Sequence, residues 1–163
     1  MGEFQRDISA KRLLELYSGM IYRIAFARTQ NKADAEDITQ NVFLKYIDSD
    51  KSFNDEEHRK AWLLRVAINC TNDFVKSAHY RNRAPLEEVP DAEVNIEEKS
   101  EIYYAVQSLP EKYRLAVHLF YYEDMSVAEI STLTKTKEST VKSQLSRARD
   151  MLRKILKEAQ YEL

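Results

Sequence analysis

The densest set of side chains suited to binding nucleic acid lies in residues 138–158, where cationic and small polar residues recur. Lysine and arginine reach phosphates or guanine edges, glutamine pairs with adenine, and serine permits close approach to a groove. Helical spacing turns Val141, Leu145 and Ala148 inward and the polar residues outward. Ser139 and Thr140 lie near its start, and its outward residues include Lys142, Ser143, Gln144, Ser146, Arg147 and Arg149.

A short helix is predicted just before this segment. Ser126 and Glu129 have the spacing of a capping box, which starts a helix that reaches about Leu133. Only the polar residues 134–137 separate it from the basic helix, so the pair predicts a helix-turn-helix. A solvated basic face on an ordinary bundle helix is the alternative. The capping box beside the basic helix favours DNA binding.

A second polar stripe follows the helix predicted over residues 59–80. An asparagine among cations on one helical face could hydrogen-bond an exposed base while its neighbours hold phosphates. Taken alone, an ordinary surface whose terminal cations complement the helix dipole is the better interpretation. The stripe and its continuation comprise Arg65, Asn69, Asn72, Asp73, Lys76, His79, Arg81 and Arg83.

A third polar surface lies on the helix predicted over residues 34–47. Its acidic first turn suits the positive end of a helix dipole. The surface could be a protein interface, although solvated surface is the better interpretation without further context. The exposed members are Glu36, Asp37, Gln40, Asn41 and Lys45.

Signals for enzymatic chemistry are weak. The three histidines lie in separate segments without ligand-like spacing, and two glycines are too few for a phosphate-binding loop. Cys70 falls on the apolar stripe of its helix and is expected in the core. We therefore expect no metal, no cofactor and no small-molecule substrate.

The elements that must position these residues are helices. Amphipathic spacing predicts helices over 10–29, 34–47 and 59–80, with a polar loop over 48–58. Further helices are expected around Ile102, Val106 and Leu109, and from a capping box at Ser108–Glu111 to Tyr122. The fold class is all-α, with two small helical domains joined by an acidic flexible linker. The second domain contains the helix-turn-helix, and the expected boundaries are 1–83, 84–98 and 99–163.

Composition fits a packed protein of this size. Of 163 residues, 44% are hydrophobic, and the net charge is −2. Residues 84–99 hold six acidic residues and one basic residue, whereas the flanking blocks are slightly basic. A protein that bound DNA without a partner would be more basic overall. Any DNA contact is therefore confined to a local surface or helped by another protein. We expect no membrane insertion, no signal peptide and, from the single cysteine, a cytoplasmic location.

Four blocks in order resemble the extracytoplasmic-function sigma factors of bacterial RNA polymerase. They are DAEDITQNVFLKYI (34–47), AWLLRVAINCTNDFVK (61–76), SLPEKYRLAVHLFYYEDMSVAEIS (108–131) and STVKSQLSRAR (139–149). The resemblance covers nearly the whole chain. It implies a promoter-specific initiation factor that binds core RNA polymerase and promoter DNA and does no covalent chemistry. It also implies an anti-sigma factor as a partner.

The resemblance assigns roles by position. The N-terminal domain would bind polymerase, recognise the minus-ten element and help to melt it, with Asn69 contacting a flipped base. Phe53, in the loop 48–58, would form part of the pocket for that base. The C-terminal helix would read the minus-thirty-five element through the eight residues from Ser139 to Arg149 named above. The polymerase-binding set is Asp34, Glu36, Asp37, Gln40, Asn41 and Lys45, and the minus-ten set is Phe53, Arg65, Asn69, Asp73, Lys76, Arg81 and Arg83.

The chain also departs from the family pattern. Lys135 stands where the family usually has glycine, which predicts a strained or differently shaped turn because a positive φ costs a non-glycine residue about 1 kcal/mol or more. Gln144 replaces a frequent arginine, so the upstream sequence preference is not transferable. The acidic linker could imitate nucleic acid inside polymerase or serve only as a solubilising tether. Its acids are Glu87, Glu88, Asp91, Glu93, Glu97 and Glu98.

Two other functions remain open at this stage. A stand-alone helix-turn-helix regulator would bind its DNA tightly without polymerase, which a gel shift would reveal. A helical adaptor that binds only protein would keep its activity after Arg147→Ala and Arg149→Ala.

Overall fold

The computed structural model describes residues 9–77 and 100–161, and these residues form helices and short connections without any strand. The all-α prediction is therefore confirmed. The chain divides into two compact units, residues 1–87 and 88–163. The predicted linker, residues 84–98, lies outside the described residues, as does the domain boundary at 83.

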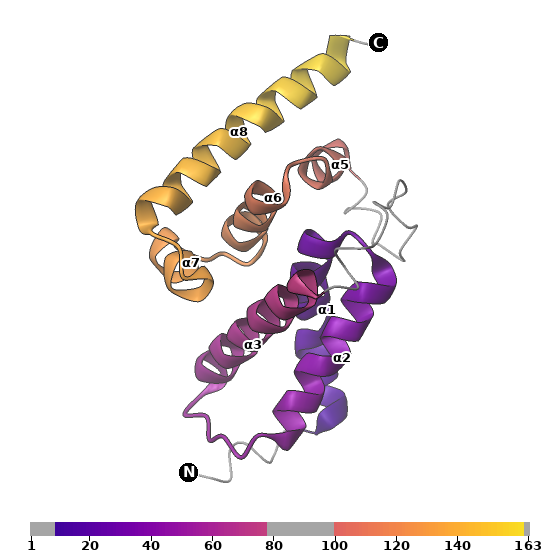
Figure 1. Ribbon diagram of the computed structural model, residues 1–163, viewed down its shortest axis with the longest axis vertical. Coiled ribbons are helices and arrows are strands. Elements are labelled where there is room, and N and C mark those ends of the chain that lie inside the picture. The colour runs from indigo at the N-terminus through magenta and orange to yellow at the C-terminus, as the bar shows by residue number, and fades with distance from the viewer. Residues whose placement is uncertain (1–8, 78–99, 162–163) are drawn as a thin grey trace. The chain divides into compact units, whose positions relative to one another are not determined.

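The first unit contains α1 (Ala10–Thr29), α2 (Lys32–Asp48) and α3 (Glu56–Lys76), each of which packs against the other two (Figure 1). Apolar residues at three- and four-residue spacing meet in its core, where Ile24, Ile38 and Leu63 are at most 1% exposed. Gln30 adopts a left-handed conformation that ends α1. The next residue, Asn31, caps the start of α2 with its side chain. This tight connection makes α1 and α2 antiparallel neighbours.

The third helix is displaced from its predicted bounds of 59–80. It begins at Glu56 because the Asp55 carboxylate accepts a hydrogen bond from the His58 backbone N–H, at 2.8 Å. It ends at Lys76, and Ser77 is extended. The prediction of helix at residue 77 was therefore wrong, and the loop predicted over 48–58 is confined to residues 49–55.

The second unit is built around one long helix, α8 (Glu138–Tyr161), which runs along α5 (Glu101–Gln107), α6 (Glu111–Val117) and α7 (Val127–Thr134) (Figure 1). A π-helical turn, η2 (His118–Tyr122), continues α6. Val106, Leu109, Tyr113, Val117 and Ala148 form a buried cluster, covered by Met151, Leu152 and Ile155. The apolar stripe of α8 thus closes the core of this unit.

The capping box predicted at Ser108–Glu111 is absent. A box with that spacing needs Leu109 in helical conformation immediately before Pro110, and the proline ring disfavours that conformation. Ser108 instead caps the end of α5 by donating to the Ala105 carbonyl at 2.7 Å, and α6 starts after Pro110. The buried Arg114 satisfies the Leu109 carbonyl at 2.7 Å.

The helix predicted to end near Tyr122 does end there, and its last turn, η2, has π geometry. Ile102, one of the three apolar residues that predicted the short helix α5, is 56% exposed. Helical spacing along one segment predicts neither the π turn nor this exposure.

The helix-turn-helix is confirmed. Ser126 and Glu129 exchange two hydrogen bonds of 3.1 Å, which complete the predicted capping box at the start of α7. Lys135 ends α7 with a φ of 55° and a ψ of 42°, and its backbone N–H donates to the Ser131 carbonyl. The turn therefore keeps the left-handed shape that glycine favours, with lysine in the strained position.

This strain predicts a stabilising substitution. Lys135→Gly is expected to raise the free energy of unfolding by about 1 kcal/mol, because glycine adopts positive φ without a Cβ clash. Lys135→Ala is the control, since it removes the side chain but keeps the Cβ. Urea denaturation of the three proteins measures the difference. Equal stability of the glycine and alanine variants would contradict a strained turn.

Candidate nucleic-acid interface

The predicted DNA-binding residues of α8 surround its first three turns on the sides away from the core. Val141, Leu145 and Ala148 are at most 1% exposed and anchor the helix to α6 and α7. The remaining positions hold polar side chains, so the anchored helix presents a polar, cationic surface. Ser139, Thr140, Lys142, Ser143, Ser146 and Arg147 are exposed, and Gln144 and Arg149 are half-buried.

Two tyrosines from α6 and η2 hold the arginines of this surface. Arg149 Nε donates a hydrogen bond of 2.8 Å to the hydroxyl of Tyr121. Arg147 hydrogen-bonds the hydroxyl of Tyr113, and this bond lowers the pKa of that phenol below its usual value. Tyr121 lies 28 residues before Arg149, and no local spacing signals that pair.

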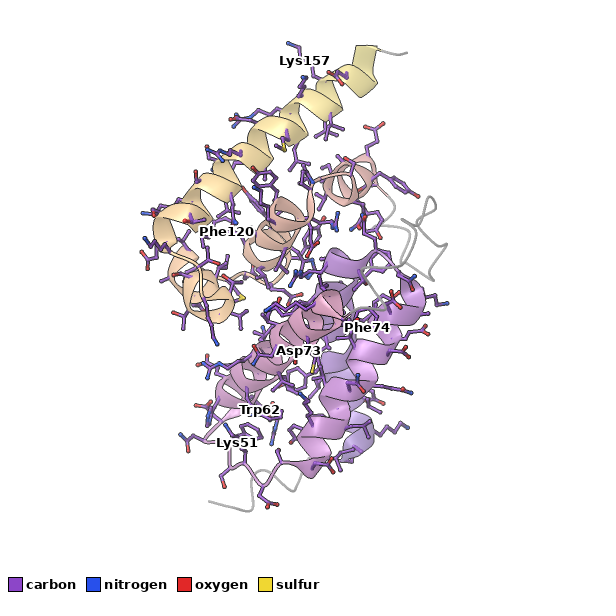
Figure 2. The ribbon with its side chains drawn as sticks, viewed as in Figure 1. Lys51, Trp62, Asp73, Phe74, Phe120 and Lys157 are labelled. Atoms are coloured by element: carbon purple, nitrogen blue, oxygen red, sulfur yellow. The ribbon has the colours of Figure 1, made fainter. Side chains whose placement is uncertain are left out.

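The predicted minus-ten residues of α3 form one exposed stripe. Arg65, Asn69, Asp73 and Lys76 are all exposed and follow one another at steps of four, four and three residues. Figure 2 shows Asp73 on this part of α3. The amide oxygen of Asn72 accepts a hydrogen bond from Arg28, so that side chain is directed toward α1. Arg81 and Arg83 lie outside the described residues.

The loop between α2 and α3 is fixed by Phe53, which is 3% exposed. Its ring stacks on Tyr46 at a centroid distance of 5.9 Å and meets Trp62 edge-on at 5.8 Å. Lys51, labelled with Trp62 at this end of the unit in Figure 2, remains exposed. Phe53 thus supports the loop from beneath, and its part in a base pocket stays a prediction.

Next to Phe53 lies a part-buried polar network that the sequence analysis did not identify. The Arg59 guanidinium is fully buried, lies 5.6 Å from the Phe53 ring centroid and pairs with Glu56. Glu56 also accepts a hydrogen bond of 2.5 Å from the Tyr17 hydroxyl. Burial, followed by this bond, raises the pKa of Tyr17 to about 12. The network ties the base of the loop to α1.

The predicted polymerase-binding residues divide by exposure. Glu36, Asp37, Gln40 and Asn41 are exposed on α2. Asp34 is 3% exposed, and its backbone N–H donates to the Asn31 cap at 2.9 Å. It therefore belongs to the buried start of the helix, where an acidic group suits the dipole.

Lys45, the last of that set, is exposed on α2 near α3. It hydrogen-bonds the thiol of Cys70, whose pKa is nevertheless raised by burial. The cysteine is buried in the core, as predicted.

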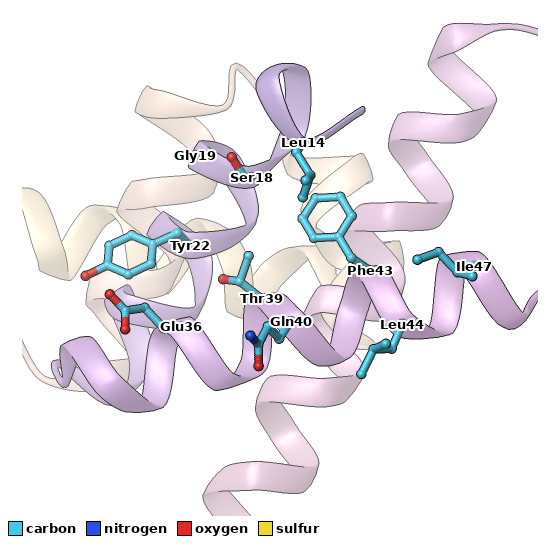
Figure 3. A pocket seen from close by; sticks show the side chains of 10 residues that line it. All are labelled: Leu14, Ser18, Gly19, Tyr22, Glu36, Thr39, Gln40, Phe43, Leu44 and Ile47. Atoms are coloured by element: carbon cyan, nitrogen blue, oxygen red, sulfur yellow. The ribbon is translucent and has the colours of Figure 1, made fainter. Parts of the chain in front are cut away.

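An apolar groove of about 790 Å³ lies between α1 and α2 (Figure 3). Leu14, Leu44 and Ile47 line it although they are 45%, 57% and 67% exposed. The sequence analysis did not single out Leu44 or Ile47. Leu44 and Ile47 are three residues apart and lie outside the buried stripe of α2. This spacing is a signal in the sequence for a second apolar face on that helix. Glu36 and Gln40 at the rim join this groove to the polar surface of α2.

The described residues contain no group of three or more histidine, cysteine or acidic side chains placed to hold a metal ion. Among the helices of the same residues, none has the length and apolarity required to cross a bilayer.

Two family models match the chain. Residues 13–81 match sigma-70 region 2, and residues 99–152 match sigma-70 region 4. Among curated proteins, SigL of Mycobacterium tuberculosis is 31% identical over 158 residues, which cover 91% of this chain and 89% of that protein. SigW of Bacillus subtilis is 29% identical over 165 residues, with 90% and 88% covered. Both are described as ECF RNA polymerase sigma factors.

Solved structures show the same fold. The sigma factor RpoE of Bartonella quintana, in complex with the anti-sigma factor NepR, matches with a TM-score of 0.64 at 21% identity, covering 90% of this chain and 96% of that one. CnrH, in complex with the cytosolic domain of CnrY, matches with a TM-score of 0.63 at 20% identity, covering 91% and 87%.

Proposed function

Because this chain belongs to the ECF subfamily of RNA polymerase sigma factors, we propose that its two helical units divide promoter recognition between them. It is an alternative sigma factor that directs transcription initiation. The main support for a separate DNA-reading role of the second unit is the surface of α8. This is the second helix of a helix-turn-helix, and eight polar residues flank its buried apolar stripe. That arrangement suits insertion into a major groove.

The second unit, residues 99–163 in our proposal, reads the minus-thirty-five element. Lys142, Arg147 and Arg149 bind phosphates or guanine edges, and Gln144 is suited to adenine. Ser139, Thr140, Ser143 and Ser146 are short enough to let the helix approach the bases closely. The long α8 is anchored along α5, α6 and α7, so the recognition turns have a rigid support.

The first unit, residues 1–83, recognises and opens the minus-ten element. Asn69 contacts a base flipped from the non-template strand, and binding this base offsets an unstacking cost of a few kcal/mol. Arg65 and Lys76, on the same face of α3, hold neighbouring phosphates, and Asp73 limits how the strand approaches. Phe53 belongs to this set through the loop that it fixes between α2 and α3, and Arg81 and Arg83 supply further cations for phosphate contacts.

Core RNA polymerase binds the exposed face of α2 through Glu36, Asp37, Gln40, Asn41 and Lys45. The apolar groove beside it, lined by Leu14, Leu44 and Ile47, supplies buried area at the centre of a polar rim, as protein interfaces require. An anti-sigma factor would compete for the same surface. This partner is supported by the neighbours RpoE and CnrH, which were solved with NepR and with the cytosolic domain of CnrY.

The protein performs no covalent chemistry in this scheme and needs no cofactor. It acts in the cytoplasm with polymerase, which makes most of the contacts to DNA. The sigma factor itself therefore need not be basic, and its net charge is −2. The acidic residues 84–98 form the linker between the two units.

The polymerase interface is tested by placing a charge in the groove. Leu44→Glu is expected to weaken binding to core polymerase by at least about tenfold, because a carboxylate at an interface centre loses solvation without a partner. Leu16→Glu is the control, since Leu16 is 44% exposed on α1 and does not line the groove. Fluorescence anisotropy of labelled protein titrated with core polymerase measures both affinities. Equal affinities for the two variants would contradict the proposed interface.

A further inference from the structure

Tyr121 contacts the DNA-binding helix from outside it. Its hydroxyl accepts the hydrogen bond from Arg149 Nε at 2.8 Å, although the side chain is 49% exposed. The contact links the π turn η2 to the cationic surface of α8.

The nitrogen through which Arg149 bonds Tyr121 determines which of its donors remain for DNA. A guanidinium has five N–H donors, and the bond to Tyr121 uses the one on Nε. The two terminal nitrogens can then form a fork toward a phosphate or a guanine edge. The phenol hydroxyl is the acceptor of this bond, so its contribution to DNA binding passes through the guanidinium.

The π turn fixes where Tyr121 lies. The Glu123 N–H donates to the His118 carbonyl at 3.2 Å, which closes the wider turn. The extra residue in a π turn rotates the following side chains relative to a continuing α-helix, and such turns recur at functional sites. Leu119, fully buried, anchors the turn, and the rings of Phe120 and Tyr121 meet edge-on at 4.9 Å.

We propose that Tyr121 is a positioning residue for the minus-thirty-five element, which holds Arg149 so that the end of its guanidinium faces the DNA. The proposal rests on the proposed function of α8. Without the phenol hydroxyl, the long arginine side chain samples many rotamers and must be ordered when DNA binds. Tyr121 thus acts through Arg149, and its effect disappears when Arg149 is absent.

The test uses the full chain with core polymerase and a promoter that this holoenzyme selects from a library. Tyr121→Phe is expected to reduce affinity for that promoter about threefold to tenfold, the contribution of one hydrogen bond. In the Arg149→Ala background the same change is expected to have no further effect. Tyr104→Phe is the matched control, because it removes a hydroxyl from a tyrosine on α5 that is 52% exposed.

Three outcomes would overturn the inference. An unchanged affinity for Tyr121→Phe, while Arg149→Ala weakens binding, would remove the positioning role and leave the proposed function intact. An equal loss from Tyr121→Phe in both backgrounds would show a purely structural role. No loss from Arg149→Ala itself would contradict both the assigned contact and the inference that rests on it.

Discussion

Alanine at both Arg147 and Arg149 is expected to reduce transcription from a promoter with an intact minus-thirty-five element by about a hundredfold, since one arginine contact contributes about 1–3 kcal/mol. Both residues lie on the polar surface of α8, outside the buried stripe, so the fold should survive their loss. Single-round run-off assays with core polymerase measure the effect. Circular dichroism of the free variant verifies that α8 remains helical.

The matched control removes the same charge from the same helix. Lys154 and Lys157 are exposed on α8 beyond the proposed contact region, and Figure 2 shows Lys157 on its last described turns. Alanine at both should change transcription by less than about threefold, as expected for the loss of unspecific attraction. Similar defects in the two double variants would show that total charge, and not the position on α8, determines promoter binding.

Alanine at Asn69 is expected to have the second large effect, a loss of at least about tenfold in open-complex formation, because the flipped base loses a hydrogen-bonding partner that offsets its unstacking. Binding to core polymerase should be unchanged, since α2 and the groove are untouched. Permanganate reactivity of the minus-ten thymines in the holoenzyme complex measures strand opening directly.

Asn72 supplies the control for that experiment. It is also an asparagine on α3, but its amide is directed to Arg28 and lies outside the proposed DNA surface. Asn72→Ala should leave strand opening near that of the unchanged protein. If Asn69→Ala and Asn72→Ala open the promoter equally well, Asn69 does not hold a flipped base.

Much of the fold was predictable because it depends on local rules. Amphipathic spacing predicted the helices over 10–29 and 34–47, whose Ile21, Ile24 and Ile38 are buried, and Ser126 with Glu129 identified the start of α7. The three helices of the first unit and the helix-turn-helix follow from these signals. The left-handed Lys135 was also anticipated, because glycine is usual at that position of the turn.

The errors lie at the ends of helices. Pro110 moved the start of α6 and left Ser108 to cap α5, although the residue types fit a capping box. The Asp55 cap starts α3 at Glu56, before the predicted residue 59, and Ser77 is already extended.

The missed residues share one property, which is that their partners are remote in the chain. Tyr121 reaches Arg149 across 28 residues, and Tyr17 reaches Glu56 across 39. Leu44 and Ile47 line a groove only because α1 packs beside α2. Periodicity within one helix predicts which face is buried, but it does not name the side chain on the other side of the contact.

The central claim is that this protein confers promoter specificity on core RNA polymerase through two separate DNA-reading surfaces. Run-off transcription across a promoter library, with core polymerase alone and with the protein added, tests it most directly. The account predicts protein-dependent transcripts whose templates share both a minus-thirty-five and a minus-ten motif. Binding to core polymerase without any protein-dependent transcript would contradict it and would indicate an inhibitor or adaptor built on a sigma-factor scaffold.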